Sequence, residues 1–369
     1  MRYLNHYRSS GRKEENRMSR RKTRVVKIGR IAVGGGNPVA IQSMTKVKTS
    51  AVAKVAAQLR LLEKEGCEIV RLSVKDNEDA AALRKIRKLT ALPLVADIHF
   101  DWRLALAAID SGVDKIRINP GNISDRKKLA NVAAAAVARG TAVRLGINSG
   151  SLPEGRGDIV TRMVKGALKY LRILEDDGLS RMVVSLKASS AGETVEAYTR
   201  ISGLCDYPLH LGVTATGLPE HGLVKSSVAI GALLLRGIGD TIRVSLTDTP
   251  QQEVRSAKLI LEAAGARTFG HEVISCPTCG RCEVNLAKIV KDLGRAISGM
   301  PVSRGRHLKI AVMGCVVNGP GEAGSADIGI AFGRNEGLLF KSGKPVGKVK
   351  YENCLAVLTS EIGKMSRSG

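Results

Sequence analysis

Short apolar segments alternate with amphipathic, helix-forming segments over most of this chain. The apolar segments lie at 38–44, 68–74, 92–100, 113–119, 142–148, 181–188, 207–214 and 240–246. The stretches between them, such as 50–65, 102–111 and 157–177, are rich in Ala, Leu, Lys and Glu. Strict alternation of strand and helix predicts parallel strands joined by right-handed crossovers. Eight such units predict an N-terminal (β/α)8 TIM barrel, with an open, doubly wound sheet as the alternative.

Polar side chains stand near the carboxyl end of nearly every predicted strand. They include Gln42, Ser43, Arg71, Asp97, His99, Arg117, Asn119, Arg144, Asn148, Lys187, His210, Arg243 and Ser245. Several are two residues apart, so they project on one side of their strand. In a barrel these ends meet at one rim, which is where barrel enzymes hold their active sites.

Five of these rim residues are cations, namely Arg71, Arg117, Arg144, Lys187 and Arg243. Any one of them could form an ion pair with a neighbouring strand. As a set they favour a phosphorylated substrate, because the guanidinium fork matches phosphate oxygens.

The pattern changes after Gly270. Strand-like segments follow at 307–314 and 326–332, helix-like segments at 283–297 and 352–366, and a glycine-rich hairpin between them. We therefore expect a disordered basic tail at 1–22, a substrate-binding barrel at 23–265, and a smaller α/β domain at 266–369 that binds a metal centre.

The candidate metal ligands are concentrated in this smaller domain. Cys276, Cys279 and Cys282 lie close together, and Cys315 and Glu322 follow later. Thiolates at such spacing bind soft metal centres. An all-cysteine zinc site that includes Cys282 is one reading. The compact Asn318–Glu322 turn instead favours Glu322 as the fourth ligand of a reactive cluster.

Charge and cysteine usage narrow the function classes. The formal net charge is +24 and there are seven cysteines. The odd count and irregular spacing favour a reducing, cytoplasmic setting. The positive charge favours anionic partners. The sequence has no basic patch interleaved with aromatic residues, so it does not favour nucleic-acid binding. The sequence contains no apolar run of about 18 residues, so we expect no membrane span.

Several motifs in order resemble those of the 4-hydroxy-3-methylbut-2-enyl diphosphate synthase family of the methylerythritol phosphate route to isoprenoids. They are QSMT (42–45), ADIHFDWRLAL (96–106), RINPGNI (117–123), RLGINSGSL (144–152), SLKAS (185–189), PLHLGVT (208–214), GIGDTIRVSL (237–246), SCPTCGR (275–281) and MGCVVNGPGEA (313–323). The resemblance covers the chain from about residue 23 to its end.

This resemblance implies an iron-sulfur oxidoreductase. The implied reaction is the reductive ring opening and dehydration of 2-C-methyl-D-erythritol 2,4-cyclodiphosphate, with electrons from a flavodoxin or ferredoxin. The implied cofactor is a [4Fe-4S] cluster on Cys276, Cys279, Cys315 and Glu322, with Glu322 also a catalytic residue. A homodimer is implied, in which the cluster domain of one subunit closes over the barrel of the other.

The family resemblance also assigns residues of the barrel. Diphosphate contacts carry over to Arg117, Arg144, Asn148, Lys187, Arg243 and Ser245, and Asp97 and His99 match catalytic rim residues. Two positions depart from the family pattern: Ala215 stands where a glutamate is expected, and Ser190 where an aspartate is expected. Glu220 or His221 could replace the missing acid. The departure at Ala215 leaves open a divergent cluster oxidoreductase that acts on another phosphorylated substrate.

Overall fold

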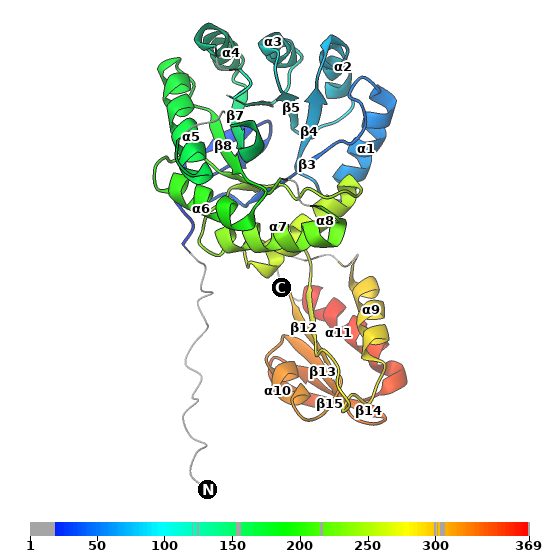
Figure 1. Cartoon of the computed structure of the whole chain (residues 1–369). Coiled ribbons are helices and arrows are strands. Elements are labelled where there is room, and N and C mark those ends of the chain that lie inside the picture. The colour runs from blue at the N-terminus through cyan, green and yellow to red at the C-terminus, as the bar shows by residue number, and fades with distance from the viewer. Residues whose placement is uncertain are drawn as a thin grey trace. The chain divides into compact units, whose positions relative to one another are not determined.

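The computed structural model describes residues 19–119, 121–123, 125–152, 156–214, 217–298, 300, 302 and 307–367. The chain divides into two compact units, with the boundary between Arg267 and Thr268 (Figure 1). Each unit has its own sheet and its own core. Within the part of the chain described, no helix is both long and apolar enough to cross a bilayer.

The first unit is built on a ring of parallel strands. They are β3 (Ala40–Met44), β4 (Ile69–Val74), β5 (Leu94–Ile98), β6 (Lys115–Ile118), β7 (Ala142–Asn148), β8 (Met182–Lys187), β9 (His210–Leu211) and β10 (Thr241–Ile242). Their hydrogen-bonded order is β8-β7-β6-β5-β4-β3-β10-β9, and a parallel bridge from Val184 to Leu209 joins the two end strands. The predicted barrel is therefore confirmed, and the open-sheet alternative is wrong.

A helix follows each barrel strand and packs outside the ring (Figure 1). The helices are α1 (Val52–Lys64), α2 (Asn77–Arg87), α3 (Trp102–Asp110), α4 (Arg126–Arg139), α5 (Ile159–Asp176), α6 (Ala191–Ser202), α7 (Pro219–Leu234) and α8 (Pro250–Ala263). Side-chain caps fix several starts: Asp76, Asp125 and Asp158 each accept a hydrogen bond from a backbone N–H of the first turn. Such caps satisfy donors that the helix itself leaves free.

A short antiparallel hairpin covers the amino-terminal end of the barrel. It consists of β1 (Val26–Ile28) and β2 (Ile31–Val33). Val26, Ile28 and Val33 are buried against residues at or near the starts of barrel strands, among them Ala40 and Ala142. This apolar plug leaves the carboxyl ends of the strands as the open end of the barrel.

The residues just before the hairpin are bound to the barrel. The backbone N–H of Arg21 donates to Gly237 O (3.0 Å), and Arg20 pairs with Asp240 (3.0 Å). These residues form the end of the basic tail expected at 1–22, and residues 1–18 lie outside the described part.

The second unit contains one mixed sheet. Its strands are β11 (Glu272–Ser275), β12 (Lys309–Met313), β13 (Ile328–Phe332), β14 (Glu336–Lys341) and β15 (Lys344–Lys350), hydrogen-bonded in chain order. The first three are parallel and the last two pairings are antiparallel. Helices α9 (Leu286–Ile297) and α11 (Cys354–Arg367) pack on this sheet through Leu293 and Leu358, which are fully buried.

One local prediction for this unit is wrong in form. The segment expected to be a stiff turn at 318–322 instead forms a short helix, α10 (Gly319–Gly324). Pro320 stands in its first turn, where a missing N–H is tolerated. A side chain on Gly319 would approach Met313 Cβ to 3.0 Å, so glycine lets α10 lie against β12 and β13.

Candidate functional site

Basic side chains from five segments converge inside the barrel. They are Arg71 on β4, Lys115 and Arg117 on β6, Arg144 on β7, Lys187 on β8 and Arg243 just after β10. Lys115 and Arg144 are 0% and 1% exposed, and Arg117 and Lys187 are 3% and 6% exposed. Lys115 was not predicted from the sequence. Its spacing of two from Arg117 places both on one side of β6, which is the signal that could have found it.

Asp97 on β5 is the carboxylate of this cluster. Its oxygens lie 3.4 Å from Arg117 Nη1, 3.8 Å from Arg71 Nε and 3.3 Å from His99 Nε2. Burial alone would raise the pKa of Asp97, but Arg71, His99, Arg117 and Arg144 outweigh it and hold the pKa well below its usual value. The structure therefore brings Asp97 and His99 together, and Asp97 stays ionised throughout the neutral range.

Replacing Asp97 with Asn is expected to destabilise the protein at pH 7 by about 3–5 kcal/mol, because buried cations lose their counterion. A carboxylate whose pKa is lowered by folding stabilises the protein above its unfolded pKa of about 3.9, and this contribution is lost as pH falls towards the folded pKa. Urea unfolding at pH 7 and pH 3 measures the effect, and the difference from wild type should narrow at the lower pH.

The matched control is Asp110→Asn, whose exposed pair with Arg139 on the helical surface should contribute no more than about 1 kcal/mol. This account would be contradicted if the two variants lost equal free energy of unfolding. It would also be contradicted if the loss in Asp97→Asn were the same at pH 7 and pH 3.

Several buried guanidinium atoms have no partner among the residues described. They are Nε and Nη1 of Arg144, Nε of Arg117 and Nε of Arg243. Burial lowers the pKa of Arg144, and its neighbours Arg71 and Arg117 lower it further. Burial likewise lowers the pKa of Arg243 to about 10. Because unpaired buried donors are costly, these atoms indicate a site shaped for a bound anion.

A glycine makes room for one of these cations. A Cβ on Gly146 of β7 would stand 2.7 Å from Arg117 Nε, too close for any other residue without displacing the guanidinium. Arg117 also donates to Gly146 O at 3.1 Å. The strand thus both admits and holds the Arg117 side chain.

The remaining predicted barrel residues lie around the same end. Asn148 is the last residue of β7 and is half-buried, and Ser245 is half-buried shortly after β10. Glu220 and His221 are exposed in the first turn of α7. Ala215 lies outside the described residues, so the structure gives no account of that position.

The cysteine segments of the second unit follow neighbouring strands. β11 and β12 pair in parallel with Ser275 opposite Val312, so Cys276 and Cys315 stand just beyond adjacent strand ends. The N–H of Gly314 donates to Cys276 Sγ at 3.3 Å. A Cβ on Gly314 would lie 2.4 Å from Cys282 Sγ and 3.5 Å from Cys276 Sγ, so both sulfurs pack against this glycine.

Hydrogen bonds distinguish the sulfurs. The backbone N–H groups of Val317 and Asn318 lower the pKa of Cys315, and Cys276 Sγ accepts the N–H of Gly314. Donors of this kind favour thiolates and tune sulfur-ligated metal centres. The Cys282 thiol instead donates to Val284 O at 3.3 Å. The donor set therefore fits an iron-sulfur centre, with Cys276 and Cys315 better prepared as ligands than Cys282.

The other two predicted ligands are exposed. Cys279 lies in the loop after β11 and Glu322 in α10. Across the described residues, no three His, Cys, Asp or Glu side chains converge closely enough to hold a single metal ion. A polynuclear cluster spreads its ligands over several irons, so it accepts a wider ring of ligands than one zinc ion does.

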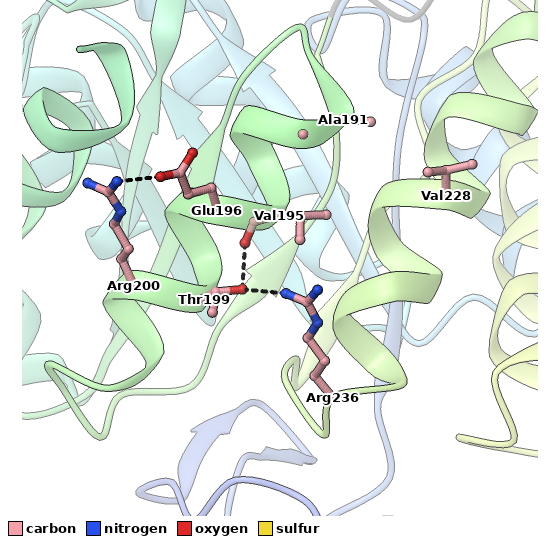
Figure 2. Close-up of a pocket in the computed structure, with 8 residues that line it drawn as sticks. Ala191, Val195, Glu196, Thr199, Arg200, Val228 and Arg236 are labelled. Carbon is pink, nitrogen blue, oxygen red and sulfur yellow. Dashed lines mark hydrogen bonds and ion pairs between the residues drawn. The ribbon is translucent and has the colours of Figure 1, made fainter.

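A separate surface pocket of about 340 Å³ lies between α6 and α7, on the outside of the barrel (Figure 2). Arg236 donates to Thr199 Oγ1 (3.2 Å), and Thr199 donates to Val195 O (2.7 Å). None of the inferred site residues lines it.

Both units match known protein domains. Residues 23–258 match the GcpE TIM-barrel domain, and residues 272–364 match the GcpE protein C-terminal domain. The chain belongs to the GcpE family.

Relatives of this GcpE chain align over nearly its whole length. One from Caldanaerobacter subterraneus is 49% identical over 351 residues, covering 94% of this chain and 98% of the relative. Another from Nitratidesulfovibrio vulgaris is 47% identical, covering 94% of this chain and 90% of the relative. Each bears the name 4-hydroxy-3-methylbut-2-en-1-yl diphosphate synthase (flavodoxin).

Solved structures resemble this GcpE chain in fold. Dihydropteroate synthase from Stenotrophomonas maltophilia aligns with a TM-score of 0.51 at 18% identity, covering 66% of this chain and 99% of that one. One from Xanthomonas albilineans in complex with 7,8-dihydropteroate gives 0.50 at 17% identity, covering 66% of this chain and 99% of that one. At this identity the likeness shows the barrel fold alone.

Proposed function

We propose that this GcpE protein is an iron-sulfur oxidoreductase, a 4-hydroxy-3-methylbut-2-enyl diphosphate synthase. It converts 2-C-methyl-D-erythritol 2,4-cyclodiphosphate to the linear hydroxymethylbutenyl diphosphate by reductive ring opening and loss of water. The names of the relatives that align over nearly the whole chain support this proposal. The observation that carries it is the set of buried, unpartnered arginine donors inside the barrel, which suit a diphosphate.

The barrel residues would bind and orient the substrate. Arg117, Arg144, Lys187 and Arg243 supply positive charge and hydrogen-bond donors to the two phosphates, and Asn148 and Ser245 add neutral donors at the strand ends. Burial strengthens these interactions because water does not compete for them. Asp97 holds Arg117 and His99 in place through its two oxygens, and the half-exposed His99 is positioned to exchange protons with the substrate.

The second unit would hold a [4Fe-4S] cluster on Cys276, Cys279, Cys315 and Glu322. Bound there, the cluster would supply electrons one at a time and a Lewis-acidic iron. A carboxylate is a weaker ligand for iron than a thiolate, so Glu322 marks the position that substrate could take. Backbone N–H groups lower the pKa of Cys315, which favours its thiolate, and the Gly314 N–H would hydrogen-bond the Cys276 sulfur beside the metal.

The partners follow from the same reading. The electron donor would be a flavodoxin, as the names of the relatives state for those proteins, or a ferredoxin. We propose a cytoplasmic homodimer in which the barrel domain, 23–265, and the cluster domain, 266–369, of different subunits cooperate. Glu220 or His221 is the proposed proton donor in place of the family glutamate, where this chain has Ala215.

Anaerobic reconstitution followed by an assay with the cyclodiphosphate and a strong one-electron reductant tests the activity. Formation of hydroxymethylbutenyl diphosphate is the expected result. An intact cluster without turnover would instead favour a divergent oxidoreductase acting on another phosphorylated compound.

If the wild-type protein turns over, Glu220→Gln should slow turnover without loss of substrate affinity. Unchanged turnover in this variant would remove Glu220 from the mechanism.

A further inference from the structure

A completely buried histidine contacts the cation cluster through Lys187 and has no part in the function proposed above. His210 is 0% exposed on β9. Its Nε2 lies 3.5 Å from Lys187 Nζ, and its Nδ1 lies 2.7 Å from Thr241 Oγ1. Each ring nitrogen therefore faces one named partner.

The fold holds His210 from two further directions. β9 and β10 pair with Thr241 directly opposite His210, so the two side chains share a face of the barrel. The hydroxyl of Tyr198, which is buried on α6, donates to the backbone oxygen of His210. The imidazole thus has little freedom to turn, and its orientation is built into the barrel.

The partner of His210 is equally confined. A Cβ on Gly212 would stand 2.6 Å from Lys187 Nζ and 3.0 Å from its Cε. Glycine at this position therefore leaves the space through which the Lys187 side chain passes. His210 is the partner that the described structure gives to the ammonium group at the end of that path.

Hydrogen-bond chemistry then decides the state of the ring. A lysine ammonium has only donors, so it needs a lone pair on Nε2 of His210. The proton of the neutral ring must then reside on Nδ1 and point at Thr241 Oγ1, which can accept it. A protonated imidazole would present an N–H to the ammonium and repel it.

We infer that His210, fixed as its Nδ1–H tautomer by Thr241, is a positioning residue that orients the Lys187 ammonium towards the substrate phosphate. This rests on the proposed function, in which Lys187 binds the diphosphate. His210 touches no substrate and acts through Lys187. The 3.5 Å contact between Lys187 Nζ and His210 Nε2 would shorten when a bound anion holds Lys187 in its charged form.

The electrostatic surroundings make this acceptor important. Burial lowers the pKa of Lys187 well below its usual value, and neighbouring arginines lower it further. The charged groups that face the Lys187–His210 pair are Arg71, Lys115, Arg117, Arg144 and Arg243. Only the protonated lysine attracts phosphate, so an acceptor that favours the ammonium extends binding to higher pH. Losing that acceptor should move the alkaline limit of binding to lower pH.

Four variants test the inference by calorimetric binding of the cyclodiphosphate to cluster-free protein between pH 7 and 9. His210→Phe, which removes the acceptor, is expected to raise Kd about tenfold and to shift the alkaline limit downwards. His210→Gln, whose amide oxygen can reach the same place, should recover most of the affinity. Thr241→Val should raise Kd about threefold, whereas Thr241→Ser should bind as wild type does. In the loaded enzyme the effect should appear in KM more than in kcat.

Controls separate the possible failures. Thermal unfolding checks that each variant folds, and the nearly isosteric Thr241→Val variant keeps the test decisive if His210→Phe does not fold. The positioning role would be overturned if both Thr241→Val and His210→Phe kept the wild-type affinity and its pH dependence. It would also be overturned if His210→Gln recovered none of the affinity lost in His210→Phe. If wild type binds inorganic diphosphate but not the cyclodiphosphate, the proposed substrate is wrong, and the same variants are then compared by their Kd for inorganic diphosphate.

Discussion

Replacing Cys315 with Ala is expected to abolish both iron binding and turnover, whereas Cys282→Ala should leave both within about twofold of wild type. The two cysteines are chemically alike but differently bonded. The N–H groups of Val317 and Asn318 lower the pKa of Cys315. The Cys282 thiol donates to a backbone carbonyl. A ligand must be a thiolate, so the environment of Cys315 prepares a ligand, whereas the Cys282 sulfur already has a hydrogen-bond partner in Val284 O.

The measurement combines iron and sulfide content, visible absorbance and turnover after anaerobic reconstitution. Cys282→Ala is a matched control, because it removes one thiol that packs against Gly314, the residue directly before Cys315. Loss of iron in Cys282→Ala with retention in Cys315→Ala would reverse the assignment. Stoichiometric zinc in the purified protein, lost in both variants, would instead support the all-cysteine zinc site.

The barrel could be predicted from the sequence because its signals are periodic and local. Every predicted apolar segment contains a barrel strand, since parallel strands buried on both faces need continuous apolar runs. The rim residues were predictable for a related reason. A charged residue such as Arg144 is costly inside an apolar run unless a ligand requires it, so its presence there already indicates a site.

The remaining features depend on tertiary contacts. The β1–β2 hairpin has strands of three residues, too short to show a period, and its burial comes from barrel residues distant in sequence. Lys115 lies within the predicted strand segment 113–119, but the pattern of that segment does not show that the side chain is fully buried inside the closed ring. The roles of Cys282 and His210 depend on which atoms face them, which residue spacing does not specify.

Replacing Arg144 with Met is expected to stabilise the protein and to remove most of its substrate affinity. Arg144 is 1% exposed, and its Nε and Nη1 have no partner in the described part of the chain. Exchanging a buried, poorly compensated charge for an apolar side chain of similar length can stabilise a fold by about 1–4 kcal/mol. The same exchange should cost about 2–5 kcal/mol in binding, because the diphosphate loses a buried, charge-assisted contact.

Thermal unfolding with and without the cyclodiphosphate, together with Kd by calorimetry, measures both effects. The unfolding temperature of wild type should rise when ligand is added. Without ligand, Arg144→Met should unfold at a higher temperature than wild type, and added ligand should raise that temperature little. Arg103→Met, an exposed change on α3, should leave both quantities nearly unchanged. A destabilised Arg144→Met protein with normal affinity would make Arg144 a structural residue. Stabilisation combined with lost affinity would instead show that the barrel gives up stability to keep a guanidinium ready for phosphate.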